Sequence, residues 1–338
     1  MKEAPLVSIQ CMVFNHEPYL RQCLDGFVMQ QVTFPFEAIV HDDVSTDASA
    51  AIIREYAEKY PDIIKPFYES ENQYRKGTIE TIMNAAIHPE SKYIALCEGD
   101  DYWTDPLKLQ KQVDFLESHP DYTMCCNRTR LYSEKLKKYI GENYCYDKSQ
   151  DILVEDIINR TGLFISTCSI VYRPEVRRDY PGYCRGCAVG DYPLQIMCAM
   201  KGKTFYFNET MAVYRVNNPN SWMGQQKWSA VSDNNLKRIR SMANMFLGFA
   251  NDYKEYKKAF ENKCAHYINT SSPDASVNPQ DNKHYFNYFK DLTSNYSIKW
   301  KFDKFFRMRS NMISRFYLLH IAPRFFRFYY QRNLYYNN

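Results

Sequence analysis

No run of about 18 apolar residues occurs in the 338-residue chain, which predicts that none of its helices spans a membrane. The chain starts with charged residues and passes directly into a strand pattern, so we expect no secretory signal peptide. Internal repeats and low-complexity tracts are also lacking. The 11 cysteines are odd in number and widely spread, which is not typical of a disulfide framework. Together these features predict a cytoplasmic globular protein with reduced thiols.

Charge is unevenly distributed along the chain, although the net charge is only +4. Residues 299–332 hold nine lysines and arginines against one acid, Asp303, so they carry about +8 and leave about −4 for the rest. In this basic tail the cations alternate with Phe, Tyr, Leu and Ile, which predicts peripheral contact with an anionic membrane surface. The alternative is a terminal helix packed on the body of the protein. No nucleic-acid-binding motif accompanies the tail, so we expect no nucleic-acid partner.

Strand and helix patterns alternate through the first hundred residues. Strands are expected at 6–14, 36–41, 63–68 and 93–97, and helices at 19–29, around 52–57 and at 78–87. Such alternation indicates βαβ units and therefore an α/β fold with a parallel sheet. The later pattern is less regular, with expected elements at 164–172 (strand), 192–200 (helix), 204–207 (strand) and, after about 228, mainly helices.

An acidic segment, Glu98-Gly99-Asp100-Asp101, directly follows the apolar strand pattern at 93–97. Carboxylates this close repel one another, and a divalent cation would neutralise them. Hard oxygen ligands at this density suit Mg²⁺ or Mn²⁺, which usually also bind a substrate diphosphate. Acidic residues are also common at helix starts, and Asp105 before Pro106 fits that structural role.

Polar clusters follow three of the expected strands, at 15–17, 42–43 and 98–101. In parallel α/β sheets, ligands bind beyond the carboxyl ends of the strands. We therefore expect these clusters to form one site.

Five short motifs occur in an order and spacing that resemble family 2 glycosyltransferases. They are Val7-Ser8-Ile9 with Phe14-Asn15, His41-Asp42-Asp43-Val44-Ser45-Thr46-Asp47, Glu98-Gly99-Asp100-Asp101-Tyr102-Trp103, Gly190-Asp191-Tyr192 and Val213-Tyr214-Arg215. The resemblance covers about residues 5–225. It implies an inverting, nucleotide-sugar-dependent enzyme with the GT-A (Rossmann-like) fold, in which helices flank a mostly parallel central sheet. Residues 1–228 would form the catalytic domain, with a nucleotide-sugar half to about 105 and an acceptor half after it, and 229–338 a helical extension.

The resemblance also implies roles for the donor-side residues. Asp42 matches the family's base-reading aspartate, which can accept from the uracil imide N–H and thus favours a UDP donor. Asp101, with Asp100 beside it, matches the metal-binding acids, with Mn²⁺ or Mg²⁺ as the cofactor. Glu98 stands where the family often has Asp, and its longer side chain reaches the ribose more easily than a tight metal shell. The implied nucleotide-sugar contacts are Phe14, Asn15, Glu17, Asp42, Asp43, Glu98, Asp100 and Arg215.

On the acceptor side, Asp191 matches the catalytic base, and Trp103 and Tyr192 match acceptor contacts. By spacing alone, Asp191 before Tyr192-Pro193 is better explained as a helix start, and the ordered motif set is what favours the base. Many relatives have a histidine soon after the Tyr-Arg pair, whereas here Arg215 is followed by Val216-Asn217-Asn218. The Gln-x-x-Arg-Trp signature of processive members is lacking, which favours transfer of a single sugar.

The leading hypothesis is a glycosyltransferase that moves one sugar to a polysaccharide or a lipid-linked glycan. A metal-dependent nucleotidyltransferase is the first rival, but its glycine-rich phosphate loop is missing from Phe14-Asn15-His16-Glu17-Pro18. A non-catalytic scaffold on the same fold is the second.

Overall fold

A computed structural model of the chain describes residues 3–160, 164–218, 221, 231–271 and 279–293. The chain divides into two compact units, the first Met1–Arg185 with Val189–Gln225, the second Gly186–Ala188 with Gln226–Asn338. The functional division proposed at residue 228 stays a prediction.

The described residues of the first unit form a ten-stranded sheet with the order β3-β2-β1-β4-β9-β6-β10-β5, in which β7 pairs with β6 and β8 with β10. The strands are β1 (Val7–Val13), β2 (Phe36–Asp42), β3 (Ile64–Tyr68), β4 (Tyr93–Leu96), β5 (Tyr102–Trp103), β6 (Tyr122–Ser133), β7 (Lys138–Asn143), β8 (Gln150–Asp151), β9 (Val171–Tyr172) and β10 (Lys203–Val216). Strands β1 to β4 run parallel, and antiparallel pairs appear from β9 onward. The mixed α/β fold is thus confirmed, and the strictly parallel part is its first half.

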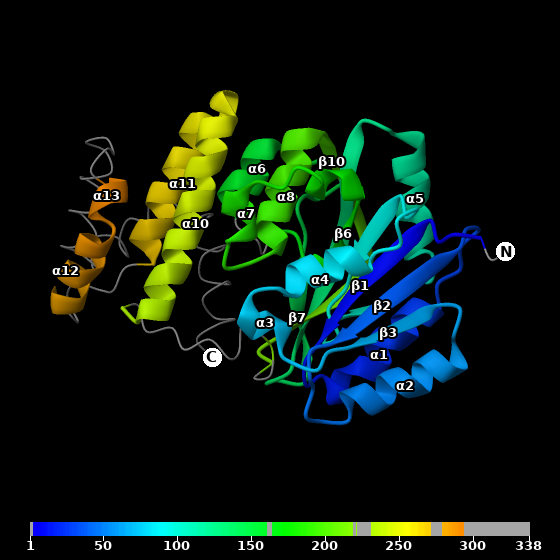
Figure 1. Cartoon of the computed structure of the whole chain (residues 1–338). Helices are drawn as coiled ribbons and strands as arrows, with labels where there is room; N and C mark the ends of the chain where they lie inside the picture. Colours follow the sequence, from blue (N-terminus) through cyan, green and yellow to red (C-terminus); the bar gives the residue numbers. More distant parts are fainter. Residues whose placement is uncertain (1–2, 161–163, 219–220, 222–230, 272–278, 294–338) are drawn as a thin grey trace. The chain divides into compact units, whose positions relative to one another are not determined.

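Helices lie between these strands in the chain and against them in space (Figure 1). Those of the first unit are α1 (Glu17–Val28), α2 (Ser49–Lys59), α3 (Gln73–Lys76), α4 (Ile79–Ala86), α5 (Lys108–Ser118), α6 (Val154–Arg160), α7 (Gly182–Arg185) and α8 (Asp191–Lys201). Short 3₁₀ turns are η2 (Thr167–Ser169) and η3 (Pro174–Arg177).

Side-chain alternation along β1 explains why this strand lies in the middle of the sheet. Its odd positions pack into the apolar core, where the Cys11 sulfur lies 3.9 Å from that of Cys23 in α1. Its even positions point to the opposite face, where the Gln10 amide donates to the carbonyl of Met83 in α4 at 2.9 Å. Because β1 is covered on both faces, its polar side chains are buried and hydrogen-bonded, as Ser8 is to Ser91 at 2.7 Å.

Two predicted elements differ from the observed ones. Of the strand expected at 164–172, only β9 forms and pairs with β4 and β6, while residues 167–169 form the turn η2 that leads into it. The short strand expected at 204–207 is the first third of β10, a 14-residue strand paired to β6 with register shifts. The polar residues Asn208 and Glu209 interrupt its hydrophobic pattern, so hydrophobicity alone predicts a shorter strand.

The second unit is helical where it is described. It contains α10 (Asp233–Asp252), η4 (Lys254–Tyr256), α11 (Lys257–Thr270), α12 (Pro279–Tyr288) and α13 (Lys290–Thr293). Ser232 caps α10 by accepting from Asn235, and Phe249 stacks on Phe260 of α11 with ring centroids 5.2 Å apart. The basic tail at 299–332 lies outside the described residues.

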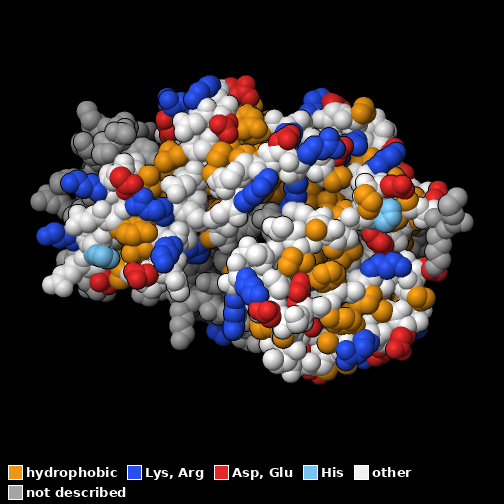
Figure 2. All heavy atoms as spheres, in the orientation of Figure 1, with side chains coloured by type: hydrophobic (Ala, Val, Ile, Leu, Met, Phe, Trp, Pro, Cys, Tyr) orange, Lys and Arg blue, Asp and Glu red, His pale blue; other side chains and the backbone are white. Residues whose placement is uncertain are grey.

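Among the described helices, none combines the length and apolar character needed to cross a bilayer. All 11 cysteines are free thiols, and ten of them are buried. Lys and Arg side chains are interspersed with Asp and Glu over the visible face (Figure 2).

A buried lysine lies in the core beneath β5. The Lys108 side chain is fully buried, donates to Gln112 Oε1 at 2.6 Å, and lies 4.3 Å from the ring centroid of Trp103. Burial lowers the pKa of Lys108 from 10.5 to about 8, since desolvation disfavours the charged amine and the neighbouring thiols, Cys125 foremost, offset this only in part.

This lysine predicts an unusual dependence of stability on pH. Between about pH 8 and 10.5 the unfolded chain binds a proton that the folded chain releases, so the free energy of unfolding should rise with pH, by about 3 kcal/mol at most. Urea denaturation of wild type and Lys108→Met at pH 7 and pH 10 measures this. We expect the stability of the variant, relative to wild type, to fall over that interval. An unchanged difference would mean that Lys108 keeps its ordinary pKa.

Candidate active site

The acidic segment Glu98–Asp101 leaves the sheet at the end of β4 and lies on the end of β1. The Gly99 N–H donates to the Met12 carbonyl at 3.0 Å, which continues the β1–β4 ladder by one step. A Cβ atom at Gly99 would lie 2.8 Å from His16 Nδ1 and 2.9 Å from a methyl of Val13. Only glycine fits this approach, and the fit fixes where the neighbouring carboxylates lie.

Burial and mutual repulsion make two carboxylates of this segment, those of Glu98 and Asp101, hard to ionise. Desolvation first, then the charges of Asp100 and Asp191, raise the pKa of Glu98 to about 8. Desolvation, Asp100 and Glu98 raise the pKa of Asp101 well above its ordinary value, and the Arg215 backbone N–H opposes them. Asp191 comes from a distant part of the sequence and accepts from Thr167, while the carbonyl of the adjacent Cys168 accepts from Trp103, two residues after Asp101, so η2 links Asp191 to the acidic segment.

The oxygen atoms of the acidic segment meet part of what a divalent cation requires from its ligands. Oδ2 of Asp101 is buried without a hydrogen-bond partner, and all the acids concerned offer hard oxygen ligands. Within the described ranges, no group of three or more His, Cys, Asp or Glu side chains is arranged to hold a metal ion alone. A cation would therefore need further ligands from a bound diphosphate and water, as Mg²⁺ commonly does.

Two adjacent acids at the end of β2 have different surroundings. Asp42 is buried, and one oxygen accepts weakly from the Ser45 N–H at 3.3 Å while Oδ1 has no hydrogen-bond partner. Asp43 uses both oxygens to accept from the N–H groups of Gln73 (2.6 Å) and Tyr74 (3.1 Å), so it holds the start of α3. Of the two, Asp42 has an oxygen left for a ligand.

The loops after β1 and β2 are tied to each other. Asn15 Oδ1 accepts from the Thr46 N–H at 2.7 Å, and Glu17 Oε2 accepts from the Ala48 N–H at 3.1 Å. Asn15 and Val44 both have positive φ angles, 57° and 64°, so each loop turns sharply where its strand ends. Asn15 and Glu17 therefore shape the edge of the sheet at the ends of β1 and β2, which we call the donor edge after its predicted nucleotide-sugar contacts. Their contact with a nucleotide, like that of half-buried Phe14, stays a prediction.

Asp191 starts helix α8, as the sequence predicts, with Gly190 as the N-cap residue. Its Oδ1 accepts from the Tyr192 N–H at 2.8 Å and its Oδ2 from the Thr167 hydroxyl at 3.1 Å. Desolvation raises its pKa despite these two hydrogen bonds. A carboxylate with a raised pKa is a better proton acceptor, so the helix-start role and a base role are compatible.

Trp103 and Tyr192 lie in the core rather than at the surface of the site. The indole N–H of Trp103 donates to the Cys168 carbonyl at 2.8 Å, and the hydroxyl of Tyr192 donates to the Ile158 carbonyl at 2.7 Å. Both residues are 2% exposed, so direct acceptor contact, expected from the sequence, would require these buried rings to move. In the observed geometry they support the segments that carry Asp101 and Asp191.

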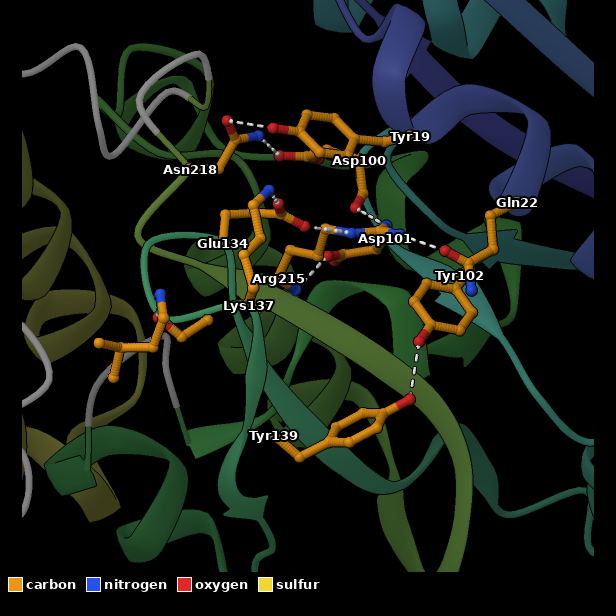
Figure 3. A network of polar contacts seen from close by, with 12 residues as sticks. Tyr19, Gln22, Asp100, Asp101, Tyr102, Glu134, Lys137, Tyr139, Arg215 and Asn218 are labelled. Carbon is orange, nitrogen blue, oxygen red and sulfur yellow. Dashed lines mark hydrogen bonds and ion pairs between the residues drawn. The ribbon is translucent and has the colours of Figure 1, made fainter.

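Arg215, near the end of β10, occupies the centre of a buried polar network (Figure 3). Its backbone N–H donates to Asp101 Oδ1 at 2.8 Å, and Nε donates to Glu134 Oε1 at 2.9 Å. Its two terminal nitrogens donate to the Asp100 carbonyl and to Gln22. All three guanidinium nitrogens thus have protein acceptors, which favours an organising role, and a contact with diphosphate stays a prediction.

Sequence reasoning missed several members of this network. Its unpredicted members are Tyr19, Gln22, Glu134 and Asn218. Glu134 follows β6 and Asn218 follows β10, in stretches without periodicity, so only long-range pairing brings them to the acidic segment. The Val216-Asn217-Asn218 departure after Arg215 is the one signal that could have directed attention there.

A cavity of about 320 Å³ opens beside the β6–β7 hairpin, near the same network. Tyr139 lines it, is 45% exposed, and shares a 3.0 Å hydroxyl–hydroxyl hydrogen bond with Tyr102, the residue after Asp101. The lining residues are Thr104, Arg130, Tyr139, Glu142, Thr210 and Val213. This hydroxyl-rich hollow is thereby connected to the acidic segment.

Comparisons with known proteins agree with this geometry. An uncharacterized protein of Mycobacterium tuberculosis is 39% identical over 209 residues, which cover 62% of this chain and 58% of that protein. Staphylococcus aureus TarS 1–349, solved in complex with UDP-GlcNAc, superposes with a TM-score of 0.56 at 14% identity over 86% of this chain and 93% of its own. The mannosyltransferase PcManGT from Pyrobaculum calidifontis, solved with GDP-Man and Mn²⁺, gives 0.52 at 14% identity, over 88% and 78%.

The chain thus spans a little more than half the length of its mycobacterial relative, and the two solved structures show likeness of fold. The model of the family described as glycosyl transferase family 2 matches residues 8–180, about half of the chain. The match includes the donor edge and the acidic segment. The chain belongs to glycosyl transferase family 2.

Proposed function

We propose that this protein is an inverting glycosyltransferase that moves one sugar from a UDP-sugar to a glycan acceptor. The observation that carries the proposal is the meeting of three differently placed acids at one sheet edge. Asp42 has a buried oxygen without a hydrogen-bond partner, desolvation and the neighbouring acids raise the pKa of Glu98, and η2 links Asp191 to the acidic segment. Family membership supports the reaction class.

On the donor side, Asp42 would accept from the imide N–H of uracil through Oδ1. Uracil shares this imide donor with thymine, and UDP is favoured because TarS, a structural neighbour, was solved with UDP-GlcNAc. Asp101 and Asp100 would hold Mn²⁺ or Mg²⁺, with Glu98 nearer the ribose. When bound, the cation would stabilise the negative charge of the departing diphosphate.

Transfer itself needs one proton acceptor. The oxygen of an acceptor hydroxyl forms a bond to the anomeric carbon, the bond from that carbon to the diphosphate oxygen breaks, and UDP leaves with the bonding electrons. Asp191 takes the hydroxyl proton during the attack. Because attack and departure occur on opposite faces of the sugar, the configuration at that carbon inverts.

The acceptor is proposed to be a polysaccharide or a lipid-linked oligosaccharide. The cavity beside Tyr139 offers hydroxyl, guanidinium and carboxylate groups next to an exposed aromatic ring, which suits contact with sugar hydroxyls and ring faces.

A thermal-shift screen of UDP-, GDP- and dTDP-sugars, each with and without Mn²⁺, tests the donor assignment. We expect the largest rise in melting temperature with a UDP-sugar plus Mn²⁺, and a smaller rise without the metal. Asp42→Ala should abolish the preference for uridine. Equal stabilisation by all donors, or stabilisation that ignores Mn²⁺, would contradict the proposed site.

Membrane contact through residues 299–332 is proposed from the sequence of the tail. The tail carries about +8 and the whole chain +4, so the excess of cations lies in the tail. We expect the full chain to float with vesicles containing anionic lipid and a chain truncated after Ser297 to stay at the bottom of the gradient. Equal flotation of both would locate the contact elsewhere.

A further inference from the structure

Asn218 joins helix α1 to the acidic segment through two hydrogen bonds (Figure 3). Its amide Nδ2 donates to Asp100 Oδ2 at 3.1 Å, and its Oδ1 accepts from the Tyr19 hydroxyl at 3.2 Å. The Asn218 side chain is fully buried, and Tyr19 is 8% exposed. These three residues, Tyr19, Asn218 and Asp100, form what we term the relay.

The chemistry of the groups fixes the direction of the relay. An ionised carboxylate can only accept, so the amide must turn its N–H₂ toward Asp100. Its oxygen then faces Tyr19, whose hydroxyl can donate. No other orientation of the amide satisfies both neighbours.

Asp100 is held at two points by the groups around it. Oδ2 accepts from Asn218, and the backbone carbonyl accepts from a terminal nitrogen of Arg215. Within the described residues no hydrogen bond reaches Oδ1, so Oδ1 is the oxygen left for an incoming group. Coordination through both oxygens would break the bond to Asn218.

We propose that Asn218 and Tyr19 are positioning residues that hold Asp100 so that it offers a single oxygen to the cation. The inference rests on the proposed function and adds to it the residues that set the strength of metal binding. Asn218 itself is not the ligand, because its oxygen is engaged by Tyr19 and its nitrogen by Asp100. Asn218, which lies 118 positions from Asp100 in the sequence, thereby orients a carboxylate of the acidic segment.

Manganese titration of the purified full chain, with UDP present and free Mn²⁺ followed by EPR, tests this without an activity assay. Loss of a group that orients a metal ligand commonly weakens binding 10- to 100-fold, so we expect about a 10-fold loss for Asn218→Ala. Tyr19→Phe, which removes only the distal hydrogen bond, should weaken binding about 3-fold. Tyr19 acts on Asp100 only through Asn218. The double variant should therefore bind Mn²⁺ no more weakly than Asn218→Ala does.

The neighbouring asparagine provides the matched control. Asn217 donates to Ser133 at 3.2 Å and has a φ of 56°, so Asn217→Gly removes an amide without straining the backbone. Its Mn²⁺ affinity should stay within 2-fold of wild type. Thermal unfolding verifies that each variant is folded, and Tyr19→Phe keeps the test decisive should Asn218→Ala fail to fold.

The outcomes separate this inference from the proposed function. If wild type binds neither UDP nor Mn²⁺, the proposed function is wrong. If wild type binds both and the relay variants bind Mn²⁺ as wild type does, or if their losses add, the positioning role is wrong. Restoration of kcat in Asn218→Ala at saturating Mn²⁺ would further support positioning, because the chemistry would then be intact.

Discussion

Asp191→Asn is expected to lower kcat for sugar transfer by about a thousandfold while leaving UDP-sugar affinity within about 2-fold of wild type. Asparagine keeps the shape and can still accept from the Tyr192 N–H, so the start of α8 should survive. What it loses is the ability to take a proton from the acceptor. The measurement is a radiolabelled transfer assay alongside calorimetric titration of the donor.

The acid limb of the pH profile should report the same group. A base works only when deprotonated, and burial raises the pKa of Asp191. We therefore expect kcat of the wild type to fall as pH drops through a value above the ordinary aspartate range, and Asp191→Glu to shift that limb.

Asp233→Asn is the matched control, because Asp233 also starts a helix, α10, in the second unit. It should leave transfer unchanged. Full activity of Asp191→Asn would remove Asp191 as the base and leave it as a helix start only.

Arg215→Met should destabilise the fold by about 3–5 kcal/mol, the usual result of removing one partner of a buried ion pair. The side chains of Arg215 and Glu134 are 5% and 6% exposed, so the variant leaves a buried carboxylate whose one remaining ion pair among the described residues is with Lys137. The guanidinium also lies 5.0 Å from the ring centroid of Tyr19 and 4.6 Å from that of Tyr102. Urea denaturation at pH 7 measures the loss.

Two further variants make this result specific. Glu134→Gln in the Arg215→Met background should recover part of the stability, because it removes the buried charge. Arg21→Met breaks a doubly hydrogen-bonded pair with Glu55 in which the two side chains are 53% and 55% exposed, and it should leave the free energy of unfolding nearly unchanged. Equal losses in Arg21→Met and Arg215→Met would contradict the organising role, and loss of UDP affinity without loss of stability would point to a diphosphate contact.

Local pattern was sufficient to predict the parallel half of the sheet and to place Asp42 and the acidic segment at one edge of it. Strand and helix periodicity located β1 to β4, and the rule for parallel sheets then brought Asp42 and Asp100 to one edge. Asp191 could be joined to them only through the resemblance, since its own spacing indicates no more than a helix start.

The remaining features depend on pairing between segments far apart in the chain. Glu134 reaches Arg215 because β6 and β10 lie side by side over most of their lengths, and no local pattern encodes that register. The burial of Trp103 and Tyr192 was missed for a related reason. An aromatic residue next to an acid has the same sequence pattern whether it covers a ligand or fills the core behind it.

Asp42 and Asp43 are identical neighbours at the end of β2, yet one has an unpartnered oxygen and the other is committed to the start of α3. A protein engineer who wished to change the preferred nucleotide would therefore have one position to vary rather than two. Libraries that randomise both together would mostly sample chains in which residues 73–76 have lost their attachment. Holding Asp43 constant keeps the scaffold of the donor edge intact while its selectivity is redesigned.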